Sequence, residues 1–324
     1  MSAREALYAV VESAYGTPKA SPTVGTDAFY FNLPDSDSFA GLMTPVLQEV
    51  PYGGGYDGLL DVAADHYTTE VQAKGLGYPT LTKFMLQLGL QQINTGQTSP
   101  WTTTEPAGDL ASASFYKLTT PRGVAAVRKR YAGCKVASLQ LDCSREDPKL
   151  RWQATLAAAR EVGNAIDASS DPDATEFPAP TDAQIPTGPY LFSHSATNLS
   201  VGGSAVTNYA SVSLKVTNKL DVLTFEGHFP TVAACHGRKI EVTFQRLLGT
   251  TPNYRTTFQG LTDKATYLKF DNGTSSFKVD LGAKCHVSAY TQQLGLGKEF
   301  LETITLTGRY DASAGTDCTL TFTP

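Results

Sequence analysis

The stretch Ser211–Thr217, SVSLKVT, alternates apolar and polar side chains residue by residue. Successive side chains of a β-strand point to opposite faces of the sheet, so this pattern predicts a strand with one buried and one solvent-facing side. Lys239–Gln245 (KIEVTFQ) and Phe277–Leu281 (FKVDL) repeat the alternation. Most of the second half of the chain is therefore expected to be antiparallel sheet, with Thr, Ser and Lys on its wet face.

The first half shows the same kinds of pattern in a similar order. Lys135–Cys143 and Leu150–Ala158 have the alternation of strands, and Tyr78–Leu90 has the apolar spacing of an amphipathic helix. In the second half only Thr256–Ala265 looks helical. Each half is thus predicted to contain strands, one helix, then strands, which is a weak internal repeat with coincidence left open as the alternative.

A proline-rich segment separates the halves. Asp167–Pro189 contains five prolines among Asp, Ser and Thr residues. Proline donates no backbone hydrogen bond and favours extended conformations, so this segment is expected to be a linker. It divides the chain into a first β domain, residues 1–166, and a second, residues 190–324.

Composition bounds the class of protein. The chain has 324 residues, 41% of them hydrophobic and 18% charged, with a formal net charge of −5. These values exclude disorder and a coiled coil and argue against a nucleic-acid binder. No membrane span, signal peptide or paired cysteine framework is expected, so we interpret the chain as one made in a reducing cytoplasm.

No convincing catalytic or metal site is found. Cys235-His236 and Cys285-His286 together suggest a two-Cys, two-His site, but adjacent side chains of a strand point to opposite faces. His66 follows Asp65, yet no nucleophile motif accompanies it, so a solvated loop histidine is the favoured interpretation. We therefore expect no enzyme activity, no cofactor and no metal.

Two segments are candidates for contact with other subunits. Gly53, Gly54, Gly55 and Tyr56 are expected to form a flexible loop that could order against a neighbour. Arg128, Lys129 and Arg130 belong to a basic cluster expected in a hairpin between two strands. Such a run is a solvated loop, a contact for an acidic surface of another subunit, or a nucleic-acid contact, and the first two are favoured.

Several stretches resemble the tail tube proteins of long-tailed bacteriophages. They are the strand pair Tyr131–Ala158, the segment Gly188–Leu220 with its turn at Gly202-Gly203, the strand Gly237–Leu248, the closing hairpin Lys298–Phe322, and the opening Glu12–Thr17 with its Glu-x-x-Tyr-Gly-Thr pattern. The resemblance covers nearly the whole chain and rests on β-structural signatures.

This resemblance implies a mainly β fold of two tandem tube-like domains, each a β-sandwich or half-barrel with one short helix, that complete a large β-barrel on oligomerisation. It implies a structural virion protein that stacks as rings into the tail tube, assembles in the host cytoplasm with itself and other tail proteins, and lets DNA pass without specific binding. If the internal repeat is real, a ring is a homotrimer with pseudo-sixfold symmetry; otherwise it is a homohexamer. A neutral to acidic lumen is expected. The alternative function is a carbohydrate-binding or adhesive β-sandwich.

Overall fold

The computed structural model describes residues 4–18, 28–31, 39–51, 59–90, 101–103, 110–120, 127–162, 188–191, 198–225, 229–248, 253–293, 300–313 and 315–323. Within them the chain is mainly β, as predicted, with nineteen strands and two short helices. The first half contains β1 (Arg4–Ala14), β2 (Thr17–Pro18), β3 (Ala28–Phe31), β4 (Phe39–Pro51), β5 (Leu59–Leu76), α1 (Pro79–Leu90), β6 (Trp101–Thr103), β7 (Ala113–Thr120), β8 (Val127–Ser144), β9 (Arg151–Ala158) and β10 (Arg160–Val162).

The second half repeats the order of strands, one helix, strands. It contains β11 (Leu199–Val201), β12 (Ser204–Ala205), β13 (Tyr209–Leu223), β14 (Val232–Leu247), α2 (Tyr254–Gln259), β15 (Thr266–Asp271), β16 (Ser276–Asp280), β17 (Cys285–Gln293), β18 (Leu301–Gly308) and β19 (Cys318–Thr323). The predicted first helix is therefore confirmed almost to the residue. The second is shorter than the expected Thr256–Ala265 and is preceded by Asn253, whose side chain caps it by accepting from the Thr256 amide.

Eight long strands form one continuous antiparallel path, in the order β4-β5-β9-β8-β13-β14-β18-β17. The first four come from the first half of the chain and the last four from the second half. Each group of four consists of a long hairpin followed in the sheet by a later hairpin in reversed order. The two halves meet where β8 pairs with β13, from Ser138 opposite Thr217 to Ser144 opposite Ser211.

The register of the two groups is also repeated, down to the β-bulges. The ladder of β8 with β9 skips one residue between Val136 and Ser138, and that of β17 with β18 skips one between Val287 and Ala289. A bulge inserts one extra residue and bends its strand, so its position is a specific marker of register.

A second pair of bulges agrees with the first. In the long hairpins one extra residue is inserted at Asp65 of β5 and at His236 of β14. Asp65 lies six residues before Val71 and His236 lies six before Val242, and these two valines are paired with equivalent positions of β9 and β18. We therefore refer to β4-β5-β9-β8 as the first unit and to β13-β14-β18-β17 as the second unit.

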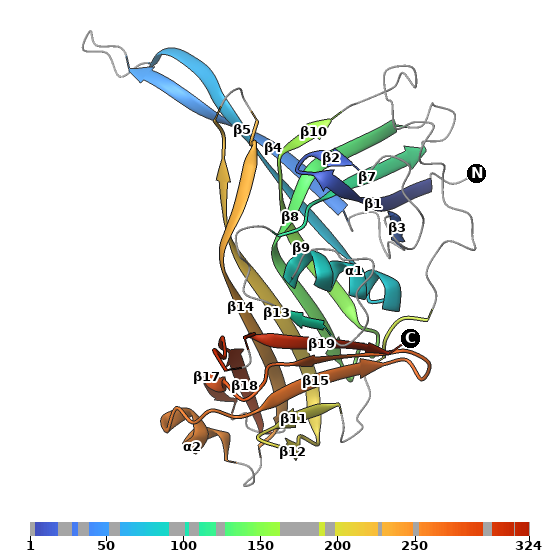
Figure 1. The fold of residues 1–324 in the computed structure, drawn as a ribbon, viewed down its shortest axis with the longest axis vertical. Helices are drawn as coiled ribbons and strands as arrows, with labels where there is room; N and C mark the ends of the chain where they lie inside the picture. The colour runs from blue at the N-terminus through green and yellow to red at the C-terminus, as the bar shows by residue number, and fades with distance from the viewer. Residues whose placement is uncertain are drawn as a thin grey trace.

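A second layer covers one face of this path. In the first unit it consists of β1, β3 and β7 with the first part of β8, and in the second unit of the sheet β12-β11-β15-β16-β19-β6. Helix α1 packs against β8 and α2 against β17. Figure 1 shows the β13–β14 hairpin running along one side of the molecule, α1 and the covering strands on the other, and the β4–β5 hairpin projecting beyond the body.

A single apolar cluster runs through both units. It includes Trp152 and Phe84 of the first half and Phe244 and Phe277 of the second, all at most 2% exposed. Burial of aromatic side chains of this size is a large favourable contribution to folding. The core therefore joins the halves that the sequence pattern separates.

Polar contacts from the second unit cap the end of helix α1. Asn218 of β13 donates from Nδ2 to the carbonyls of Gly89 (2.8 Å) and Val136 (2.9 Å). Arg238 of β14 donates to the carbonyl of Leu90 and pairs with Asp317 through two hydrogen bonds of 2.8 and 2.6 Å. The last carbonyls of a helix have no partner within it, so these side chains satisfy them and fix the units to each other.

Two expectations on local structure are wrong, and a third falls on residues outside the described ranges. A hairpin loop is expected at Arg128–Arg130, but β8 begins at Val127 and these residues are paired with β7. A loop is also expected at His66, but this residue lies in β5 opposite Val46. The proline-rich segment lies outside the described residues up to position 187, so the division at 1–166 and 190–324 stays a prediction.

Candidate functional site

The uncovered face of the eight-stranded path, which we call the polar face, has a uniform chemical character in the described ranges. Along β13 the buried residues Val212, Leu214 and Val216 alternate with Ser213 and Lys215 on this face. Ser, Thr and Gln predominate on the neighbouring strands. One row of cross-strand neighbours reads Lys74, Gln153, Gln140, Lys215, Glu241, Thr307.

Two pairs of charges on the polar face stand opposite each other with opposite signs. Arg151 of β9 is the cross-strand neighbour of Asp142 of β8, and Lys215 of β13 that of Glu241 of β14. Lys239 Nζ also lies 2.8 Å from Glu241 Oε1. Cross-strand pairs of opposite charge stabilise a sheet modestly and cancel each other's field at a distance. The described part of this face is therefore close to neutral.

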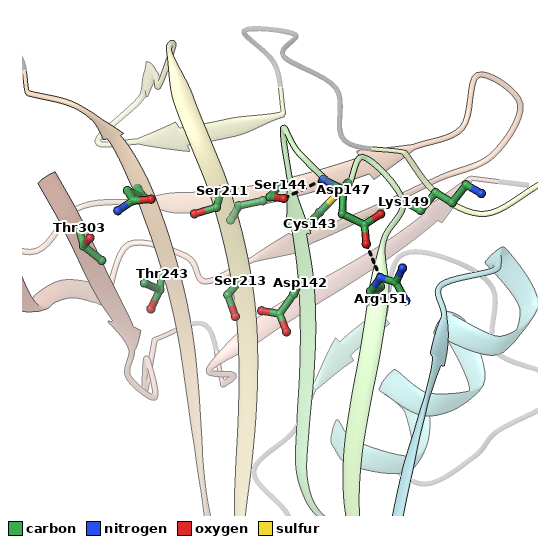
Figure 2. A pocket seen from close by; sticks show the side chains of 12 residues that line it. Asp142, Cys143, Ser144, Asp147, Lys149, Arg151, Ser211, Ser213, Thr243 and Thr303 are labelled. Atoms are coloured by element: carbon green, nitrogen blue, oxygen red, sulfur yellow. Dashed lines mark hydrogen bonds and ion pairs between the residues drawn. The ribbon is translucent and has the colours of Figure 1, made fainter. Parts of the chain in front are cut away.

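A shallow hollow of about 320 Å³ opens on the polar face where the two units join. Figure 2 shows Asp142, Ser213, Thr243 and Thr303 along its floor, with Arg151 reaching Asp147 at one wall. The hydroxyls of Ser213, Thr243 and Thr303 come from three strands of the second unit, and the charged groups come from β8, β9 and the turn between them. The hollow is thus a feature of the sheet junction.

The thiol of Cys143, which lines this hollow, is unreactive at neutral pH. Cys143 Sγ donates to the Pro148 carbonyl at 3.3 Å. Burial, followed by the nearby carboxylate of Asp147, raises the pKa of the Cys143 thiol to about 12. A thiol reacts as its thiolate, so this group is protonated at neutral pH. Its described surroundings contain no histidine that would act as its base.

Among the residues that the structure describes, both ends of the eight-stranded path are open edges over most of their length. In the described residues, β4 has β5 as its ladder partner, and β17 beyond Val287 has β18. The start of β17 is covered on its other side, where His286 bridges Asp263. Leu42 on β4 is 68% exposed. Unpaired strand edges present free backbone groups that another chain can pair with.

Apolar side chains are also exposed at both ends of the β13–β14 hairpin. At its tip they are Val222, Leu223, Phe225, Phe229 and Val232, of which Phe225 is 70% exposed. At the opposite end of β14 they are Leu247, Leu248 and Phe300. The 16 residues of β14 separate the two ends by about 50 Å. Clusters of this kind mark interaction surfaces.

Of the two segments predicted to contact other subunits, the structure describes the basic cluster and not the loop. Gly53, Gly54, Gly55 and Tyr56 lie outside the described residues. Lys129 Nζ lies 2.8 Å from Glu161 Oε1 of β10, and the backbone of Arg128 and Arg130 pairs with β7. The role of both segments in subunit contact stays a prediction.

The Glu12–Thr17 motif has a structural role. The Glu12 carboxylate accepts hydrogen bonds from the amides of Gly16 (2.8 Å) and Gly133 (2.7 Å) and from the Ser114 hydroxyl (2.7 Å). Both glycines have positive φ, 78° and 71°, which side chains disfavour. The motif therefore ties β1, β7 and β8 together.

The two Cys-His dipeptides do not come together. Cys235 lies in β14 and Cys285 in β17, with β18 between these strands. His236 Nε2 instead lies 3.1 Å from Asp221 Oδ2. Among the side chains that the structure describes, no three of His, Cys, Asp and Glu are grouped to hold a metal ion.

Taken together, the fold and its surfaces define a mainly β protein whose distinctive features, in the residues that the structure describes, are a nearly neutral polar face and open strand edges. The family model described as phage tail tube protein matches residues 2–284. The match extends over most of the chain, and the protein belongs to this family, whose members are structural components of the phage virion. A search of curated proteins finds no match. Neither helix in the described ranges is long and apolar enough to cross a lipid bilayer.

Proposed function

We propose that this protein polymerises as stacked rings into the phage tail tube and that its polar face lines the channel through which the DNA genome passes. The observation that carries the proposal is the eight-stranded path, which over the described part of the chain is covered on one face, polar on the other and open at both edges. Closing a sheet into a barrel removes its edges, and antiparallel sheets of this length commonly meet that need by closure or by pairing with another copy.

The covered face belongs on the outside of such a ring. The second layer and the helices need more circumference than the eight-stranded path itself, and only the convex side provides it. The polar face is then turned toward the lumen. Its Ser, Thr and Gln side chains and its paired charges offer few uncompensated cations to phosphate groups, so DNA would slide without being held by counterion release.

The repeated units favour three chains per ring over six. Three chains supply 24 strands, and six supply twice as many. With strands ~4.8 Å apart and tilted by ~40°, a 24-stranded barrel is about 48 Å across at the backbone. A 48-stranded barrel would be about twice as wide and would leave a channel far larger than a duplex requires.

The apolar ends of the β13–β14 hairpin suit contact between successive rings. The exposed tip around Phe225 and the exposed end around Leu247 and Phe300 lie at opposite ends of β14. A head-to-tail contact between different surfaces builds an open filament, as a tube requires.

Negative-stain electron microscopy of the purified protein tests the proposal. We expect rings or tubes from the parent chain, and rings without tubes from Phe225→Asp, because a charge at the tip is costly to bury between rings. Phe225→Tyr, which keeps the aromatic ring, is the matched control and should still form tubes. A protein that remains monomeric at high concentration, with and without other tail proteins, would overturn the proposal.

A further inference from the structure

We propose that β17 of one chain pairs in antiparallel fashion with β4 of the next chain, in a defined register from Ala289 opposite Thr44 to Gln293 opposite Ala40. This inference rests on the proposed ring assembly and names the two edges that close it. The partner is a second copy of the same chain. The contact would be the equivalent, between chains, of the β8–β13 pairing within the chain.

The β8–β13 junction is the template. It joins the last strand of the first unit to the first strand of the second unit through the consecutive pairs from Ser138 opposite Thr217 to Ser144 opposite Ser211. β17 is the last strand of the second unit and β4 is the first strand of the first unit. Within the chain, the last strand of one unit pairs with the first strand of the next. Because the two units are equivalent, the two strands left at the ends of the eight-stranded path are again a last strand and a first strand.

The bulges fix which residues are equivalent on the β17 side. Val287 precedes its bulge as Val136 precedes the bulge of β8, so Ala289 corresponds to Ser138. The sequences agree as well, since Cys285-His286-Val287 matches Cys134-Lys135-Val136 at two of three positions. From there to Gln293 and Asp142 the equivalence continues without another slip.

The second pair of bulges fixes the β4 side. Val71 of β5 corresponds to Val242 of β14, and their partners in the hairpins are Gly41 and Leu214. Thr44 therefore corresponds to Thr217. Transferring the template pairs places Leu42 opposite Thr291 and Gly41 opposite Gln292.

The chemistry of both edges suits this pairing. Neither Ala40–Thr44 nor Ala289–Gln293 contains a charged residue, although charges are the usual protection of an exposed edge. Pro45, which lacks a backbone donor, lies just beyond the last pair of the ladder, where the template also ends at Thr217. Leu42, exposed in the single chain, would gain Thr291 as a cross-strand neighbour on the polar face.

Engineered cysteines test the register. The double variant Leu42→Cys/Thr291→Cys, assembled and oxidised, should give covalent oligomers on a non-reducing gel, with the ladder ending at the number of chains per ring. Cross-strand neighbours lie ~4.5–5.5 Å apart at Cα, within the range of a disulfide. All five native cysteines are buried, so they should not form disulfides with the engineered cysteines.

Two matched variants serve as controls. Gln140→Cys/Lys215→Cys occupies the template positions and should form its disulfide within one chain, without oligomers. Ala40→Cys/Thr291→Cys shifts the register by two residues on the same face and should cross-link at least ~10-fold less, because the two Cα atoms then lie beyond the reach of a disulfide.

The outcomes separate the two proposals. Tubes in the microscope without a Leu42–Thr291 cross-link would overturn this inference and leave the tube function standing. Equal cross-linking of the shifted pair would overturn the register. Absence of rings and tubes would overturn the proposed function and this inference with it.

Discussion

A buried ion pair in the second unit gives the sharpest test of the packing. Arg246 of β14 and Glu302 of β18 form a hydrogen-bonded pair whose side chains are 6% and 2% exposed. The guanidinium lies 4.5 Å from the ring centroid of Tyr254 in α2, and the Tyr290 hydroxyl donates to Glu302 at 2.9 Å. At the equivalent positions the first unit has Gly75 and Trp152, which are paired in the same register and contain no charge.

Glu302→Leu should therefore destabilise the unassembled subunit by about 3–5 kcal/mol, because it leaves a guanidinium charge in the core without its carboxylate. The double variant Arg246→Met/Glu302→Leu should recover most of that loss, because an apolar pair of similar volume is tolerated there, as it is in the first unit. The assay is urea unfolding of the monomer, since assembly would make the apparent stability depend on concentration.

An exposed pair on the same strand provides the control. Lys239 and Glu241 lie 2.8 Å apart with side chains 56% and 20% exposed, so Glu241→Gln should cost less than about 1 kcal/mol. A loss below about 1 kcal/mol for Glu302→Leu, or a double variant as unstable as the single one, would refute the reasoning.

Three further predictions concern stability. Glu12→Gln should lower the free energy of unfolding by about 2–3 kcal/mol, because a neutral amide replaces the carboxylate that accepts from Gly133 and two other donors; an unchanged urea midpoint would contradict this. Asn218→Ala should raise amide exchange in the last turn of α1 well above that of its first turn, since the Gly89 carbonyl in that turn loses its donor; uniform exchange along α1 would count against it. Burial raises the pKa of Cys143 to about 12 and of Cys285 to about 11, so their contribution to stability is complete below pH ~8.5 and is lost as pH rises toward these values, by up to about 1.4 kcal/mol per pH unit for each thiol. The urea midpoint should therefore fall between pH ~8 and ~10 and fall less in Cys143→Ala; an equal fall in both proteins would exclude the thiol as the cause.

Sequence patterning predicts the strands whose two faces have different environments. β13 and β14 lie between a core and water, so their alternation is regular and reveals them directly. The start of β8 escapes prediction because Arg128–Arg130 form a basic run that is typical of a loop, whereas the structure pairs them with β7 and satisfies Lys129 through Glu161. Local pattern contains no information about the partner strand that supplies these contacts.

The open edges and the polar face depend on strand order, which the sequence pattern does not determine. β8 and β13 are separated by the proline-rich segment in the chain, yet they pair through consecutive residues. One signal of the repeat is nevertheless present in the sequence. Cys285-His286 suggests a metal site, but its counterpart Cys134-Lys135 marks it as the buried start of an equivalent strand, with the thiol facing the core.

Cryo-electron microscopy of assembled tubes tests the central claim most directly. The account predicts three chains in each ring, six similar but distinguishable lobes, a 24-stranded barrel with the polar face toward the lumen, and β17 of each chain beside β4 of the next. A ring of six chains with strict sixfold symmetry, or a lumen lined by the second layer, would contradict it.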